Sequence, residues 1–135
     1  MPRSSRHWAS LGVLALGVAA VAVVATMAWS SQQQAESIAR AMTGGEPSRA
    51  PDVLRRYGCA GCHTISGIPG ADGQVGPPLS GLIHRVYIGG VAANTPSHLV
   101  QWIVAPQSLS PNSVMPASGI SEAEARDVAA YLYSH

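Results

Sequence analysis

The longest apolar stretch of the chain lies near its N-terminus. From Trp8 to Trp29 the sequence carries no charge and consists almost entirely of Ala, Val, Leu and Gly. At a rise of about 1.5 Å per residue, a helix of about 20 residues spans a bilayer core of about 30 Å. The pattern predicts a transmembrane anchor at residues 8–29, and a signal sequence, cleaved or uncleaved, is the alternative.

The length and the flanks of this stretch favour the anchor. A signal sequence usually has an apolar region of about 7–15 residues that ends at a small-x-small cleavage site. This stretch is longer, and its one passable site, Thr26-Met27-Ala28, is followed by the bulky Trp29. Because Arg3 and Arg6 precede the stretch, both alternatives predict a cytoplasmic N-terminus at residues 1–7 and a remainder that crosses the membrane.

A polar connection follows the apolar stretch. Ser30 to Met42 is polar and mildly helix-prone, and residues 43–50 (Thr-Gly-Gly-Glu-Pro-Ser-Arg-Ala) have the composition of a flexible tether. We therefore expect a linker at residues 30–50 and a folded domain at residues 51–135.

Periodic apolar positions and end signals predict three helices in this domain. The first starts at Pro51, in an N1-like position, and carries apolar residues on one side as far as Tyr57. The second has Thr95 as its N-cap and Pro96 at N1. It must end before Pro106, because proline has no backbone N–H for the helical hydrogen bond.

The third helix has the clearest signals. Ser121-Glu122-Ala123-Glu124 is a capping box. An apolar face follows at spacings of i, i+3, i+4 and i+7, formed by Ala125, Val128, Ala129 and Leu132. Gly- and Pro-rich loops at 67–78 and 106–119 separate the helices, and there is no strand-like alternation of any length. These patterns predict an all-α fold.

Composition limits both the core and the partners of the domain. A domain of about 85 residues has a thin core. The chain also lacks Phe, so another apolar group would have to supply bulk. Beyond residue 30, six Arg face seven acidic residues, and the chain has no Lys. Without a basic patch, nucleic acid binding is not expected.

One motif carries candidate chemistry, Cys59-Ala60-Gly61-Cys62-His63. A disulfide between the two cysteines would close a tiny loop and stabilise little. Cys-x-x-Cys-His is instead the attachment signature of c-type haem. Two thiols three residues apart on one turn can reach the two vinyl groups of one porphyrin edge, and His63 then lies under the iron. The motif predicts one haem c, attached through Cys59 and Cys62, with His63 as the proximal ligand.

Three alternatives to haem attachment stay open. A zinc site needs about four ligands, so His84 or His98 would have to join the two cysteines. A thioredoxin-like redox pair would need a βαβ frame, which the patterns do not predict. The motif could also occur by chance.

A six-coordinate iron needs a second axial ligand, and Met115 is the candidate. It is the only Met after residue 50, and it lies in a Pro-rich loop, Ser113-Val114-Met115-Pro116, away from any apolar helical face. A thioether opposite His63 favours Fe(II) and raises the reduction potential. His84 and His98 are alternative ligands, which we interpret as surface or loop residues.

With Cys59 and Met115 in register, residues 51–135 resemble a class I cytochrome c. The resemblance implies that the Pro77 carbonyl of Gly76-Pro77 accepts a hydrogen bond from the proximal His63, which would fix the orientation of the imidazole. It also implies that Leu79 lies on the haem.

The resemblance assigns further positions along the chain. Arg85 falls where the family often has an arginine near a haem propionate, Trp102 where it has an aromatic residue near the Met side of the haem, and Ser113 where a hydroxyl lines the same pocket. Tyr131 and Leu132 match positions at which the C-terminal helix crosses the first helix, although the first helix lacks the family's small Gly or aromatic pair there. A solvated Arg85 and a Trp102 in the protein core are the structural alternatives.

The resemblance also predicts the function. Three segments, Ile88–Pro96, Trp102–Gln107 and Met115-Pro116, are similar to haem domains attached to haem–copper terminal oxidases. A Met/His-ligated haem without an open coordination position implies a membrane-tethered electron carrier, which is not an enzyme and has no small-molecule substrate. The expected partners are the membrane and a respiratory oxidase or quinol-oxidising complex, on the periplasmic side of a bacterial cytoplasmic membrane. A haem-based gas sensor with a labile or absent Met ligand and a structural haem subunit are the alternative functions.

Overall fold

The computed structural model describes the backbone of residues 4–135 and the side chains of residues 11–135. The expected cytoplasmic segment, residues 1–7, therefore lies largely outside the described part of the chain, together with the side chains of Arg3 and Arg6. The chain divides into two compact units, residues 1–34 and residues 35–135.

Helix α1, Ser4–Thr43, contains the stretch predicted to be an anchor and the polar residues that follow it. Its portion Leu11–Thr43 is long and apolar enough to cross a membrane, with a mean hydropathy of 2.4 in its most apolar window and none of that window buried. This makes it a candidate span by length and composition, a test that a signal sequence near the N-terminus would also pass.

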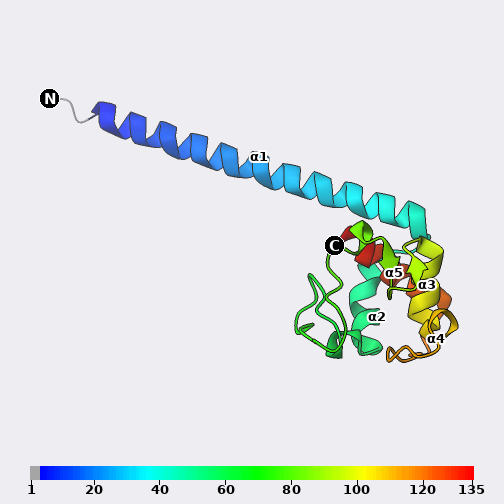
Figure 1. Ribbon diagram of the computed structural model, residues 1–135. Helices are drawn as coiled ribbons and strands as arrows, with labels where there is room; N and C mark the ends of the chain where they lie inside the picture. Colours follow the sequence, from blue (N-terminus) through cyan, green and yellow to red (C-terminus); the bar gives the residue numbers. More distant parts are fainter. Residues whose placement is uncertain (1–3) are drawn as a thin grey trace. The chain divides into compact units, whose positions relative to one another are not determined.

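The second unit is mostly helical, as predicted, with short helices joined by long loops (Figure 1). It also contains a small antiparallel hairpin, in which Tyr87 pairs with Ala93 and Ile88 with Ala92, and which the sequence patterns did not predict. In chain order the elements are the 3₁₀ helix Pro47–Arg49, α2 Ala50–Arg56, the 3₁₀ helices Cys59–Gly61 and Leu82–His84, β1 Tyr87–Ile88, β2 Ala92–Ala93, α3 Pro96–Val104, α4 Pro106–Leu109 and α5 Glu122–Ser134.

The predicted starts of α3 and α5 and the predicted end of α3 are confirmed, whereas α2 begins one residue before the predicted Pro51. At the start of α3 the Thr95 hydroxyl accepts a hydrogen bond from the His98 backbone amide at 3.2 Å, and α3 ends at Val104, before the proline that begins α4. At the start of α5, Ser121 and Glu124 form the reciprocal capping box, with distances of 3.3 and 3.2 Å. These caps satisfy amides that the first turn of a helix otherwise leaves without partners.

Helix α5 lies at the centre of the core, where it packs against α2 and α3. Ala125 and Ala129 of α5 are completely buried, and their small side chains allow the neighbouring helices to approach closely. The Tyr57 hydroxyl after α2 donates to the Glu124 carboxylate of α5 at 2.9 Å. Aliphatic side chains fill most of the remaining core, among them Val53, Leu54, Leu99, Ile103, Val128 and Leu132.

Residues 43–50, predicted to be a flexible tether, are instead packed against α5. Gly44 ends α1 with a φ of 70°, the left-handed conformation that favours glycine at a helix C-terminus. Gly45 lies so close to α5 that a Cβ there would be 2.0 Å from the carbonyl oxygen of Arg126. The two glycines that make this segment resemble a linker therefore serve a helix end and a close backbone contact.

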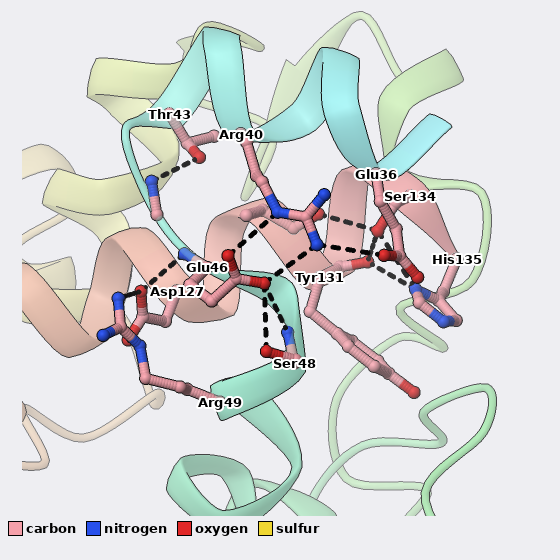
Figure 2. Close-up of polar contacts among 12 residues, drawn as sticks. Glu36, Arg40, Thr43, Glu46, Ser48, Arg49, Asp127, Tyr131, Ser134 and His135 are labelled. Carbon is pink, nitrogen blue, oxygen red and sulfur yellow. Dashed lines mark hydrogen bonds and ion pairs between the residues drawn. The ribbon is translucent and has the colours of Figure 1, made fainter. Parts of the chain in front are cut away.

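Polar contacts join the same segment to α5 and to the end of α1 (Figure 2). The nearly buried Asp127 carboxylate accepts a hydrogen bond from the Glu46 backbone amide at 2.7 Å and pairs with Arg49 at 2.9 Å. The Glu46 carboxylate in turn pairs with Arg40 of α1 at 2.9 Å. In the structure, residues 35–50 belong to the same compact unit as α2 to α5, and this unit begins before the expected boundary at residue 51.

Candidate haem-binding site

The Cys59–His63 motif lies on a single tight turn directly after α2. Gly58 follows the helix with a φ of 71°, which turns the chain and lets the 3₁₀ helix Cys59–Gly61 begin. The backbone amides of Cys62 and His63 both donate to the Cys59 carbonyl, at 3.2 and 3.0 Å. Both thiols and the imidazole therefore project from one turn, as attachment to a single porphyrin edge requires.

The state of the two thiols distinguishes among the alternatives for this motif. Cys59 and Cys62 are both free and half-buried. Burial raises the pKa of the Cys59 thiol, whereas a thiol–disulfide exchange site needs a thiolate with a lowered pKa. Among the described residues, no three His, Cys, Asp or Glu side chains are grouped to hold a metal ion, which argues against zinc.

His63 is held by the loop that contains Pro77. Its Nδ1 lies 2.8 Å from the Pro77 carbonyl oxygen. Because a carbonyl can only accept, Nδ1 carries the hydrogen and the lone pair of Nε2 is available for a metal. Gly76 packs flat against the ring, where a Cβ would lie 2.2 Å from Cε1. The hydrogen bond that the family resemblance implied is thus present, and it fixes both the tautomer and the orientation of the imidazole.

Leu79 and Arg85 both make hydrogen bonds within the part of the chain that surrounds Pro77. Leu79 is half-buried against the core, and its amide donates to the Thr64 carbonyl at 2.9 Å. The Arg85 guanidinium donates to the carbonyl of Pro78 and, at 3.5 Å, to that of Ser80. The Arg85 guanidinium therefore contacts the backbone just after Pro77 and is not fully solvated.

The candidate second ligand lies in the loop between α4 and α5. Met115 is half-buried, and its backbone amide donates a hydrogen bond to the Ser113 hydroxyl at 3.2 Å. Trp102 of α3 is partly buried against the core, and its ring lies against Gly89, where a Cβ would be 2.5 Å from the indole. In the view of Figure 1, the loop after α2 and the loop before α5 both lie at the lower edge of the second unit.

The two histidines considered as alternative ligands lie in other elements than the Cys59–His63 turn and the loop of Met115. His84 is exposed at the end of the 3₁₀ helix Leu82–His84. His98 is in the first turn of α3, and its Nδ1 lies 2.9 Å from the Ala93 carbonyl. His84 is therefore a surface residue, whereas His98 is half-buried and hydrogen-bonded to its own local backbone.

Comparison with known proteins agrees with this geometry. Residues 49–135 match the Cytochrome c family, which is more than half of the chain. The chain belongs to the cytochrome c family. Membership implies a covalently bound haem c and haem-based electron transfer, and it confirms the family and the fold predicted from the motifs.

This cytochrome is also similar to one part of a larger protein. It is 36% identical over 83 residues to cytochrome c oxidase subunit 2 of Alkalihalophilus pseudofirmus, an alignment that covers 61% of this chain and 23% of that subunit. The chain therefore corresponds to less than a quarter of that relative. No solved structure matches the chain.

The residues of this cytochrome fit the haem that its family implies. Cys59 and Cys62 offer free thiols on the turn that carries His63, and the Pro77 carbonyl leaves Nε2 of the imidazole available. The absence of a side chain at Gly76 leaves room for the ring. A bound porphyrin would also add apolar bulk to a chain that has no Phe.

Two supporting residues of the site were not predicted from the sequence. The Asn94 amide donates to the carbonyls of Leu82 and Arg85, at 2.8 Å each, and the Gln107 amide donates to the carbonyls of Ser113 and Met115. Both act on backbone carbonyls several residues away. A short sequence pattern has no signature for such contacts.

Proposed function

We propose that this cytochrome is a membrane-tethered monohaem electron carrier that delivers single electrons to, or within, a haem–copper terminal oxidase. In this proposal Cys59 and Cys62 would attach the haem, and His63 and Met115 would hold its iron. The observation that carries the proposal is the imidazole of His63, fixed by Pro77 on the turn that also presents both thiols.

The protein's residues would determine how readily the site gives up an electron. The haem, when bound, supplies an iron that cycles between the ferric and ferrous states. The hydrogen bond from Nδ1 of His63 to the Pro77 carbonyl fixes the tautomer and the orientation of the imidazole that would hold this iron. A thioether from Met115 favours the ferrous state and raises the potential. If His63 and Met115 both hold the iron, the iron would have no coordination position left for a substrate, which suits a carrier rather than an enzyme.

Two observations support the tether and the partner. Leu11–Thr43 has the length and composition of a membrane span, and the relative from A. pseudofirmus is named as an oxidase subunit. A carrier held at the membrane meets its partner at a high effective concentration. The proposed location is the periplasmic side of a bacterial cytoplasmic membrane, with a quinol-oxidising complex as the electron donor.

Purification of the full chain from membranes in mild detergent tests the proposal. Intact mass should show one covalent haem and a retained N-terminal segment, and the oxidised protein should show the weak far-red band of Met–Fe(III) ligation. Cys59→Ser is the control for covalent attachment, and Met115→Leu is the control for the band. An oxidase should copurify with the protein or accept its electrons.

The same measurements identify the competing functions. Ready CO binding at neutral pH without the far-red band would indicate a gas sensor and contradict the carrier. A normal band with no electron transfer to any respiratory complex would indicate a structural haem subunit.

A further inference from the structure

The loop that carries Met115 has few hydrogen bonds of its own. We define the Met115 loop as residues 111–120, between α4 and α5; it contains two prolines and a glycine. Within it, the Ser113 amide donates to the Ser110 carbonyl at 2.9 Å, and the Met115 amide donates to the Ser113 hydroxyl at 3.2 Å. Such a loop has considerable conformational freedom unless contacts from elsewhere restrict it.

One side chain from outside the loop supplies that restriction. Nε2 of Gln107 lies 2.7 Å from the Met115 carbonyl oxygen and 3.2 Å from the Ser113 carbonyl oxygen. The two hydrogens of one amide NH₂ can serve both acceptors. Among the described residues, no other side chain outside the Met115 loop hydrogen-bonds to it.

The helix that carries Gln107 is anchored in the core. Gln107 is in the first turn of α4, and the preceding Pro106 is completely buried. The amide therefore connects an anchored helix to the carbonyls on both sides of Val114, which is 92% exposed and contributes little packing of its own.

We propose that Gln107 is a positioning residue that keeps the Met115 thioether on the iron. This inference rests on the proposed ligation by Met115. By holding the carbonyls of Ser113 and Met115, the amide fixes the backbone from which the thioether reaches the metal. Without it the loop samples more conformations, the thioether leaves the iron for a larger share of the time, and an external ligand competes more successfully.

The test is the affinity of the ferric, haem-loaded full chain for imidazole, followed by the loss of the far-red Met–Fe(III) band. Gln107→Leu removes both donors, and Gln107→Glu keeps the shape of the side chain but replaces the NH₂ group with an oxygen that accepts. Because two hydrogen bonds to the loop are lost, either variant should bind imidazole about tenfold more tightly than the wild type. Thermal unfolding, measured in parallel, should change by a few degrees at most.

Gln101→Leu is the matched control. The Gln101 amide also donates to the α4 segment, at 3.0 Å to the Ser108 hydroxyl, but it does not reach the Met115 loop. Its imidazole affinity should equal that of the wild type. Unchanged affinity in the Gln107 variants, or an equal increase in Gln101→Leu, would overturn the inference. A wild-type protein without the far-red band would refute ligation by Met115, and the role of Gln107 would fall with it.

Discussion

Gly76 touches His63 more closely than any residue with a side chain could. An alanine Cβ at this position would lie 2.2 Å from Cε1 and 2.9 Å from Nε2 of the imidazole. We therefore expect Gly76→Ala to move the ring away from the Pro77 carbonyl. The yield of protein with covalent haem should fall strongly, as measured by haem absorbance relative to total protein.

A variant at a second glycine, Gly70, distinguishes this steric effect from the effect of backbone strain. Gly70 has a φ of 76°, but a Cβ there would meet nothing within 4 Å. Gly70→Ala should cost about 1–2 kcal/mol of stability, because an L-residue is disfavoured in the left-handed region, and should leave the haem content unchanged. Wild-type haem content in Gly76→Ala would show that the close contact with His63 is dispensable.

At the scale of the elements, the segment before α2 is part of the domain's structure. A chain that begins at Ala35 retains Arg49 and the Glu46 amide, the partners of Asp127. A chain that begins at Pro51 loses both, and it also loses the buried side chains of Ala39, Pro47 and Ala50. We expect the shorter chain to be less stable by about 3–5 kcal/mol, because it loses buried apolar contacts as well as the polar contacts of Asp127.

Chemical denaturation of the two haem-loaded chains measures this difference. Asp127→Asn in the longer chain weakens the contact with Arg49 but keeps the apolar contacts of the segment, so it should lose only part of this stability. Equal stability of the chains that begin at residues 35 and 51 would mean that the packed segment contributes nothing to folding.

The ion pair between Arg40 of α1 and Glu46 should stabilise the fold less at acid pH. The Arg40 guanidinium, followed by the Ser48 hydroxyl, lowers the pKa of Glu46 from 4.5 to about 2. Above pH 4.5 Glu46 is ionised in both the folded and the unfolded chain. As the pH falls from 4.5 towards 2, the unfolded chain takes up the proton first, so the free energy of unfolding decreases over this window.

Glu46→Gln removes that proton uptake and should flatten the pH dependence of the unfolding free energy between pH 4.5 and 2. High salt should reduce the difference between variant and wild type, because the pair with Arg40 is accessible to solvent. Parallel acid unfolding curves at low salt would contradict the role of Glu46.

Whether an element could be predicted depends on how far apart in the sequence its contacting residues lie. Thr95 and Ser121 cap amides three residues away, so short patterns predicted the starts of α3 and α5. The order in residues 43–50 depends on α5, about 80 residues further along the chain, and composition alone suggested a tether. Likewise, Asn94 accepts from the Tyr133 hydroxyl at 2.7 Å across 39 residues, and no local signal marks it.

The residues of the candidate site also differ in how well the sequence could predict them. Cys59, Cys62 and His63 were predicted because covalent attachment requires a fixed spacing. The hydrogen bond between His63 and Pro77 was predicted only through the family resemblance. Gln107 was missed, because its partners are backbone carbonyls, which every residue possesses.

At the scale of the whole molecule, charge is distributed unevenly along the chain. From Gly73 to Ser121, a stretch that includes Pro77 and the Met115 loop, Arg85 is the only Asp, Glu, Lys or Arg. The two most exposed large hydrophobic side chains of residues 35–135 are in this stretch, Val75 at 76% and Val114 at 92%. They directly precede Gly76, which contacts His63, and Met115.

This distribution determines how the proposed carrier should meet its partner. Electrostatic steering raises association rates by about 10–10³-fold and is lost as ionic strength rises. Because the segments around the site are nearly uncharged, we expect the rate of electron transfer to the oxidase to change only slightly between low and high salt. Val114→Asp places a charge beside Met115 and should make the rate salt-dependent, while Ile38→Asp, at an exposed position on α1, should not. A wild-type rate that falls steeply with salt would show that charges elsewhere on the domain guide the encounter, and that a neutral surface around the site is not what the partner recognises.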